Sequence, residues 1–278
     1  MAFAAPSNTC SAINEEPACQ YGCAPDFFGR KCNLDGTSLP VNLIDYWPLT
    51  LEESDDLIAI GFNGLQLSTT TTGYKPMFTQ FTSMAPILRI PDATDTRLVV
   101  NLLNSMTTLT VSVWVKFDRE LLGRRTTSET TYPLFVMENS GTGATAEVYV
   151  SPLNKNWVYI SSTNEAFDIS STSTTMTGMD DAGTLITVTL TGTSIYMMRG
   201  DSETGPTVTV PSIGTISNIY LGSSPAARTG TNNLLDFNGW MACFSVTNNA
   251  ISNTELESLY NSCQLFKASP NSQSLFFI

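Results

Sequence analysis

The segment Thr108-Leu109-Thr110-Val111-Ser112-Val113-Trp114-Val115-Lys116 decides the fold class of this 278-residue chain. Its odd positions are apolar and most of its even positions carry a hydroxyl. Because successive side chains of a strand point to opposite faces of a sheet, this alternation places the apolar residues on one face. Val and Thr are both β-branched, which suits a half-buried strand. We therefore expect a β-strand whose odd positions, from Leu109 to Val115, face a core.

Other short runs of the chain alternate in the same way. They are 146–150, 185–190, 207–210 and 241–246. From about Thr37 onward, turn-forming Gly, Pro, Asn, Asp and Ser separate such runs at the roughly 8–12-residue spacing of antiparallel β-sandwiches. The pattern predicts an all-β fold in which two antiparallel sheets pack face to face.

One helix is predicted near the C-terminus. The segment Ser252-Asn253-Thr254-Glu255 has the spacing of a capping box, in which a Ser and a Glu satisfy free N–H groups at the start of a helix. Ile251 before it and Leu256 after it are placed as a hydrophobic staple. We expect a short helix that begins here.

The apolar stripe of this helix carries a cysteine. Leu256, Leu259, Tyr260 and Cys263 fall at i, i+3, i+4 and i+7, so all four face the sheet. Cys263 then lies within reach of Cys243 on the preceding strand. A disulfide between them would close a loop of about twenty residues and stabilise the fold by about 3 kcal/mol.

The remaining cysteines are clustered near the N-terminus, at Cys10, Cys19, Cys23 and Cys32. A structural zinc site is one reading of such a cluster, but the paired C-x2-C spacing is missing and the chain has no histidine. Disulfides are the favoured reading, although four cysteines allow three connectivities. Since disulfides persist in oxidising compartments, we expect a secreted or cell-surface protein.

The charge and composition exclude several classes of function. The chain has 13 Lys and Arg against 25 Asp and Glu, a net charge of −12, and no histidine. The missing histidine removes Ser-His-Asp catalysis and histidine-rich metal sites. The acidic balance argues against nucleic acid and anionic membranes as partners. No apolar run is long enough to predict a transmembrane segment.

Two parts of the chain resemble known extracellular families. The segment from Tyr21 to Cys32 resembles the closing loop of EGF-like modules, with eight residues between Cys23 and Cys32. That resemblance implies a Cys23–Cys32 pair and a Cys10–Cys19 pair. A full EGF module has six cysteines, so this segment is similar to a truncated one.

The longer part, residues 37–265, is similar to laminin-G-like and pentraxin-like domains. The residues that carry the resemblance are Tyr46-Trp47-Pro48-Leu49, 109–116, 195–200, 219–222, 237–241 and 248–252. The resemblance implies a concanavalin A-like jelly roll that binds carbohydrate or protein outside the cell. The chain then divides into a cysteine-rich segment (1–36), a jelly-roll domain (37–265) and a tail (266–278).

Three sets of residues are candidates for a site. Arg199-Gly200-Asp201 follows a predicted strand and is expected on an exposed hairpin tip, where it could bind an integrin-type receptor. Asp180 and Asp181 form an acidic pair that could bind calcium, although no cofactor is required. The third set consists of aromatic residues that could stack on sugars or fill the core, namely Trp157, Tyr159, Phe167 and Trp240.

The leading hypothesis is a secreted, non-catalytic binding or adhesion module for an extracellular protein or glycan. No strand carries the alternating acids of jelly-roll glycoside hydrolases, so we do not expect an enzyme. There is no N-glycosylation sequon, while Ser68 to Thr72 and Ser170 to Thr175 could accept O-linked sugars. The alternative is a structural subunit of an extracellular fibre or coat, with self-assembly through the apolar tail Leu275 to Ile278.

Overall fold

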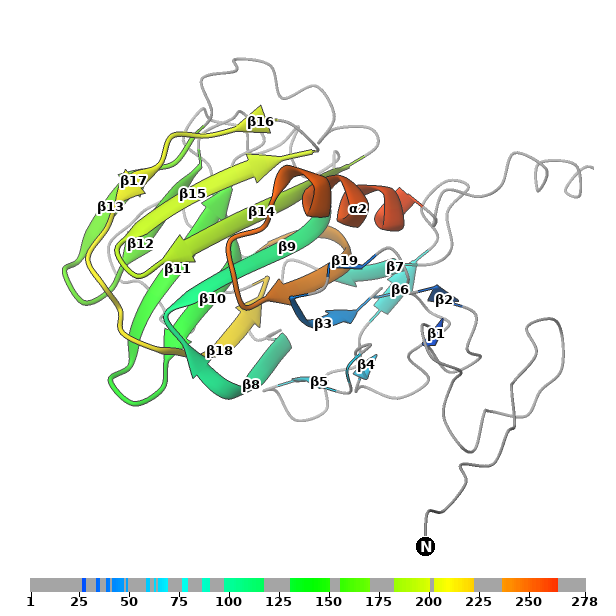
Figure 1. Ribbon diagram of the computed structural model, residues 1–278, viewed down its shortest axis with the longest axis horizontal. Helices are drawn as coiled ribbons and strands as arrows, with labels where there is room; N and C mark the ends of the chain where they lie inside the picture. The colour runs from blue at the N-terminus through cyan, green and yellow to red at the C-terminus, as the bar shows by residue number, and fades with distance from the viewer. Residues whose placement is uncertain are drawn as a thin grey trace, which may run out of the picture.

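The computed structural model shows two antiparallel sheets packed face to face and one short helix (Figure 1). It describes residues 27–28, 34–35, 39–40, 42–47, 49, 59–60, 63, 65–69, 77–79, 87–90, 98–117, 131–150, 156–170, 183–200, 203–222 and 237–264. The predicted all-β sandwich is confirmed. The predicted boundaries after residues 36 and 265 lie outside the described residues, so the division into three parts stays a prediction.

One sheet has eight strands. In spatial order they are β13 (Glu165–Asp168), β12 (Trp157–Ile160), β11 (Ala144–Val150), β10 (Tyr132–Asn139), β18 (Ile216–Leu221), β8 (Leu98–Met106), β5 (Gln66–Thr69) and β4 (Ala59–Ile60). Every neighbouring pair is antiparallel.

The other sheet has nine strands. Its main path is β16 (Glu203–Thr204), β15 (Ser194–Arg199), β14 (Thr184–Thr191), β9 (Thr108–Phe117), β19 (Gly239–Thr247), β7 (Ile87–Ile90) and β6 (Met77–Thr79). Strand β17 (Val208–Thr209) pairs with β15, and β3 (Leu43–Trp47) pairs with β19. Separately, β1 (Phe27–Phe28) and β2 (Leu34–Asp35) form a small two-stranded sheet in the predicted cysteine-rich segment.

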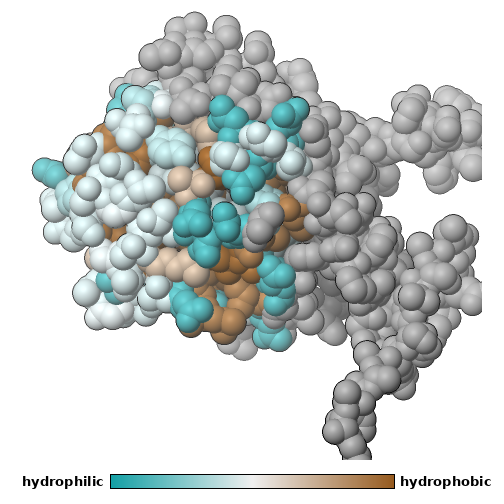
Figure 2. All heavy atoms as spheres, viewed as in Figure 1, coloured by the Kyte–Doolittle hydropathy of each residue, from teal (hydrophilic) through white to brown (hydrophobic). Residues whose placement is uncertain are grey.

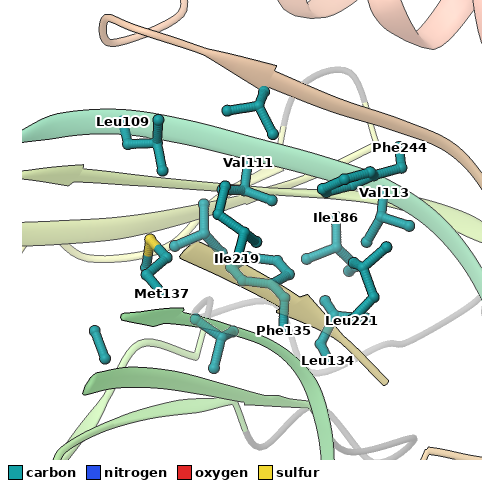
Figure 3. Packing of buried hydrophobic residues seen from close by; sticks show 14 of the residues in the cluster. Leu109, Val111, Val113, Leu134, Phe135, Met137, Ile186, Ile219, Leu221 and Phe244 are labelled. Atoms are coloured by element: carbon teal, nitrogen blue, oxygen red, sulfur yellow. The ribbon is translucent and has the colours of Figure 1, made fainter. Parts of the chain in front are cut away.

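The core lies between the two large sheets. Leu109, Val111, Val113 and Val115 of β9 are all completely buried, which confirms the predicted core face. They belong to one cluster with side chains of the facing sheet, as Figure 3 shows for Phe135, Met137, Ile219 and Leu221. Each such side chain contributes roughly 1.5–3 kcal/mol by leaving water, so this interface is the main source of stability.

The opposite face of β9 is buried as well, which goes beyond the half-buried strand that the sequence predicts. The hydroxyls of Thr110 and Thr189 lie 2.8 Å apart, and those of Ser112 and Thr187 also lie 2.8 Å apart. Because each hydroxyl has a partner, its burial carries little penalty. This second face is covered by helix α2 (Asn253–Gln264), which lies across the nine-stranded sheet in Figure 1.

Strand β19 departs from strict alternation. Ala242 pairs with Trp114 and Ser245 pairs with Ser112, so two residues of β19 oppose one of β9. Cys243 has a φ of 52°, in the left-handed region, as expected at a β-bulge. The bulge puts Ala242 and Cys243 together on the helix side and returns Phe244 to the core.

Helix α2 begins as predicted. The Ser252 N–H donates to Glu255 Oε2 (2.8 Å), and the Glu255 N–H donates to Ser252 Oγ (3.3 Å). The Ser252 hydroxyl also donates to Glu255 Oε2 (2.6 Å), and this bond and that of the Ser252 N–H lower the pKa of the Glu255 carboxyl. Ile251 and Leu256 are both buried in the cluster beneath the helix, so the capping box and the staple are confirmed.

Strand β3 is fastened to the start of β5 through Asp45, which is fully buried. Its carboxylate accepts the N–H groups of Tyr46, Asn63 and Leu65 at 2.6–2.8 Å. Burial raises the pKa of this carboxyl, while the three backbone donors oppose the rise. Next to it, the Trp47 indole donates to the Leu65 carbonyl (3.1 Å) and stacks on Phe244 at 4.9 Å. The group joins one sheet to the other.

Candidate functional site

Arg199, the first residue of the Arg199-Gly200-Asp201 tripeptide, is not exposed as the sequence predicts. Arg199 ends β15, and only 6% of its surface is exposed. The Gly200 N–H donates to the Leu185 carbonyl of β14 (2.8 Å), which holds the turn against the sheet. Asp201 lies outside the described residues. The expectation of an exposed guanidinium is therefore wrong, and a role for Asp201 stays a prediction.

The predicted calcium and cysteine sites fall mostly outside the described residues. These are Asp180, Asp181, Cys10, Cys19, Cys23 and Cys32. Within the described part of the chain, no group of three or more acidic, cysteine or histidine side chains is placed to hold a metal ion. Nor does that part contain a helix that is long and apolar enough to cross a membrane.

Cys243 is disulfide-bonded. It is buried beneath α2, where the bulge in β19 directs it toward the helix. Cys263 lies on α2, but its side chain is outside the described side chains. The Cys243–Cys263 pair thus stays a prediction that is consistent with the bulge and the helix.

Among the described residues, the outward face of the eight-stranded sheet carries aromatic and polar side chains, whereas helix α2 packs against the other sheet. Strand register aligns Tyr159 of β12 with Glu147 of β11, and Glu147 with Val136 of β10. Val136 in turn pairs with Tyr220 of β18. Because directly paired residues of neighbouring strands lie on the same face of a sheet, these residues form a row across four strands.

An aromatic platform, made of Trp157 and Tyr159, lies at one end of this face. Trp157 is 37% exposed. Its ring meets the ring of buried Tyr149 edge-on, with centroids 6.4 Å apart, so one partner fixes the indole while part of it stays in water. The Tyr159 hydroxyl donates to the Asn164 side chain at the tip of the β12–β13 hairpin. Asp168 pairs with Trp157 across the hairpin and is exposed.

Beside the platform, on the neighbouring strand β11, both oxygens of a buried carboxylate accept hydrogen bonds. Glu147 is only 1% exposed. Its Oε2 accepts the Tyr149 hydroxyl (2.6 Å), and its Oε1 accepts the Thr145 hydroxyl (2.9 Å). These bonds fix Tyr149, which in turn contacts Trp157, so the Glu147 network stabilises the platform from the neighbouring strand.

A second polar group, the carboxylate–amide cluster, consists of Glu138, Asn218 and Tyr220. The Asn218 amide and the Tyr220 hydroxyl both donate to Glu138 Oε2, each at 2.8 Å. All three side chains are half-buried. Exposed Asn101 of β8 pairs with Asn218 and extends the cluster by one strand.

The predicted aromatic candidates divide between this face and the interior. Trp157 and Tyr159 form the platform, whereas Phe167 packs against the core and Trp240 packs near helix α2, with the Lys116 ammonium 5.9 Å from its ring. The carboxylate–amide cluster was not predicted from the sequence. Its available signals were Glu138 at the end of an apolar strand and the alternation of Asn218 and Tyr220 with apolar residues in β18, which do not show that the two strands are neighbours.

No protein-family model matches the chain, and no curated protein matches it. Solved structures do match. Domain 4 of AbnA, a GH43 extracellular arabinanase from Geobacillus stearothermophilus solved in complex with arabinotriose, is 14% identical with a TM-score of 0.52, over 79% of this chain and 98% of that chain. The botulinum neurotoxin type G receptor-binding domain is 12% identical with a TM-score of 0.54, over 79% of this chain and 51% of that chain.

A third match is botulinum neurotoxin type C, whose cell entry depends on interaction with two ganglioside molecules. It is 13% identical with a TM-score of 0.55, over 80% of this chain and 52% of that chain. The chain therefore spans about half the length of the matched toxin structures. At these identities the likeness shows that the fold is shared: a β-sandwich of the jelly-roll kind.

Proposed function

We propose that this chain is a non-catalytic carbohydrate-binding module whose aromatic platform stacks on a sugar ring. The observation that carries the proposal is the position of Trp157, which is held by Tyr149 yet 37% exposed. An indole face offers a flat apolar surface to the C–H face of a sugar, and Trp is enriched at binding hot spots. Tyr159, Asn164 and Asp168 add hydrogen-bonding groups beside it.

The matched structures support this proposal without carrying it. The described arabinanase domain is in complex with arabinotriose, and the toxin structure concerns ganglioside interaction. Proteins with this sandwich are thus known to engage carbohydrates. An extracellular location, and the finer reading as a laminin-G-like domain after an EGF-like segment, belong to the same proposal. The disulfide at Cys243 supports an oxidising compartment.

The proposed role requires neither a catalytic step nor calcium. Glu138 and Glu147 are on neighbouring strands and diagonal to each other, but the Glu147 carboxylate is buried and bonded to Tyr149 and Thr145. It is therefore placed to support Tyr149 and not to meet a substrate. Calcium at Asp180 and Asp181 stays an optional addition to the proposal.

A glycan array tests the proposal. The wild-type chain, Trp157→Ala and Asn248→Ala are applied with and without a calcium chelator. Asn248→Ala is the control, because Asn248 is exposed beyond β19 on the other sheet. We expect Trp157→Ala to lose about tenfold or more in binding, as hot-spot tryptophans do. Asn248→Ala should match the wild type.

Two outcomes contradict this proposal. One is a folded wild-type chain that binds no glycan on the array. The other is a Trp157→Ala variant that binds as strongly as the wild type. Circular dichroism and the thermal midpoint of each variant establish that a loss of binding is not a loss of fold. Loss of all binding after chelation would contradict only the optional role of calcium.

A second candidate function is assembly with further copies of the chain, as in an extracellular fibre or coat. The observation that favours it is Leu103, which is 85% exposed in β8. Four residues of β8, from Leu102 to Ser105, oppose one residue of β18, so this stretch bulges out of the β8–β18 pairing. Figure 2 shows apolar surface gathered over β3 and β8 and bordered by hydrophilic residues.

Sedimentation separates the two candidates. If copies associate through this patch, Leu103→Asp shifts the chain from an oligomer to a monomer, because a buried unpaired charge at an interface is costly. A wild-type chain that sediments as a monomer at all concentrations rules the assembly out. A chain truncated after Ala268 tests the separate contribution of the apolar tail.

A further inference from the structure

We infer that the carboxylate–amide cluster of Glu138, Asn218 and Tyr220 is a second sugar-contacting position, so that the ligand is an oligosaccharide and not a single sugar. This inference rests on the proposed function, and it specifies in addition that the ligand has more than one sugar unit. The cluster lies on the same outward face as the aromatic platform, three strands away from it.

The hydrogen bonds within the cluster orient its side chains and still leave acceptor oxygens for a ligand. Both donors, the Asn218 amide and the Tyr220 hydroxyl, go to Glu138 Oε2. Within the described structure, no hydrogen bond reaches Glu138 Oε1 or Asn218 Oδ1, and neither atom is among the buried unpaired ones. Both oxygens therefore face solvent as acceptors that are held in place. Adjacent hydroxyls of a sugar are donors that suit such a pair.

Further hydrogen bonds fix the backbone of the strands that carry the cluster. The single Ser217 O–H of β18 lies within reach of two acceptors, the Glu138 carbonyl (3.3 Å) and Ser140 Oγ (2.8 Å), and Ser217 Oγ accepts the Ser140 N–H (2.9 Å). The Asn139 amide donates to the Ile213 carbonyl (2.9 Å). The cluster thus stands on two fixed strands, as a preorganised binding position requires.

Strand spacing sets the ligand length. From β12, which carries Trp157, to β18, which carries Asn218, there are three strand intervals, or about 14 Å. Glu147 and Val136 lie between the two positions and are buried. The side chains that a ligand can contact are therefore those at the two ends of this row. A single sugar ring cannot reach both positions, whereas an oligosaccharide can.

Binding to two oligosaccharide series tests the inference by isothermal titration calorimetry. The probes are arabino-oligosaccharides and ganglioside-type oligosaccharides, each from the monosaccharide to the hexasaccharide. The proteins are the wild type, Trp157→Ala, Asn218→Ala and Glu138→Gln, with Asn248→Ala as the matched control, since Asn248 is exposed beyond β19 on the other sheet. We expect wild-type affinity to rise with length until both positions are filled.

The variants should respond differently to length. Asn218→Ala and Glu138→Gln should leave the shortest ligands unaffected and weaken the longest about tenfold, the effect of losing a hydrogen bond to a charged group. Trp157→Ala should weaken ligands of every length. Two outcomes overturn this inference but not the proposed function. One is a wild-type affinity that does not depend on ligand length, and the other is equal affinity of Asn218→Ala and Asn248→Ala for the longest ligands. No wild-type binding to either series overturns the proposed function together with it.

Discussion

The two outward faces of this sandwich differ in how far their described side chains are covered. On the nine-stranded sheet, helix α2 covers Trp114, Leu185 and Cys243, and paired hydroxyls fill the rest of β9 and β14. On the eight-stranded sheet, described aromatic and polar side chains remain partly exposed, and Trp157 is the most exposed of the aromatic ones. Both sheets turn apolar side chains toward the core, and they differ in which of their described outward side chains are covered.

The largest expected effect on stability comes from removing a side chain that helix α2 packs against the nine-stranded sheet. Leu256→Ala removes a fully buried side chain between α2 and the sheet, and should destabilise the protein by about 2–5 kcal/mol. Leu103→Ala, the same change on the open sheet, should alter stability by less than about 0.5 kcal/mol. Urea unfolding of both variants measures the contrast. Equal effects would mean that α2 does not seal its face.

A smaller effect is expected from the buried hydroxyl pairs. Ser112→Ala leaves the Thr187 hydroxyl without its 2.8 Å partner and should cost about 1–3 kcal/mol. The double variant Ser112→Ala, Thr187→Val should recover much of this loss, because it removes both polar groups. Denaturant midpoints of the single and double variants provide the test. Additive losses in the double variant would show that the pair is not coupled.

The smallest expected effect is the pH dependence of the helix cap. The pKa of Glu255 is lowered in the folded state from an ordinary 4.5, chiefly by the Ser252 hydroxyl and N–H. The folded state therefore favours the ionised form. The resulting stability is present above pH 4.5 and is lost as the pH falls through the lowered pKa.

Thermal midpoints between pH 2 and 7 measure this effect. The wild-type midpoint should fall more steeply below about pH 4.5 than that of Glu255→Gln, whose side chain does not titrate. Ser252→Ala removes the other half of the capping box and should cost about 1 kcal/mol at neutral pH. Parallel curves for the wild type and Glu255→Gln would show that the cap does not hold the helix over its face.

Much of the fold could be predicted because its signals are local. The alternation in Leu109 to Val115 and the capping box at Ser252 depend only on residues a few positions apart. The burial of both faces of β9 could not be predicted, because Thr and Ser suit a solvated face and a paired, covered face equally. The same ambiguity affected Arg199, where a turn signal suggested exposure and packing against β14 and β16 produced burial.

The candidate site also has a part that local sequence signals predict and a part that depends on long-range strand pairing. Trp157 and Tyr159 stood out as aromatic residues in a strand, and only the choice between surface and core was open. The cluster of Glu138, Asn218 and Tyr220 joins β10 to β18, about eighty positions apart in the chain. No periodic pattern reports which distant strands will pair, because the partner is chosen by sheet order.

The sequence by itself determined the strand periodicity, the helix start and the composition that excludes histidine-based catalysis. These follow from side-chain chemistry and near-neighbour geometry. Only the tertiary structure decided which strands are adjacent, where the β19 bulge turns Cys243 toward α2, and which outward side chains are buried. Those outcomes depend on long-range packing, in which buried area and paired polar groups are settled across the whole fold at once.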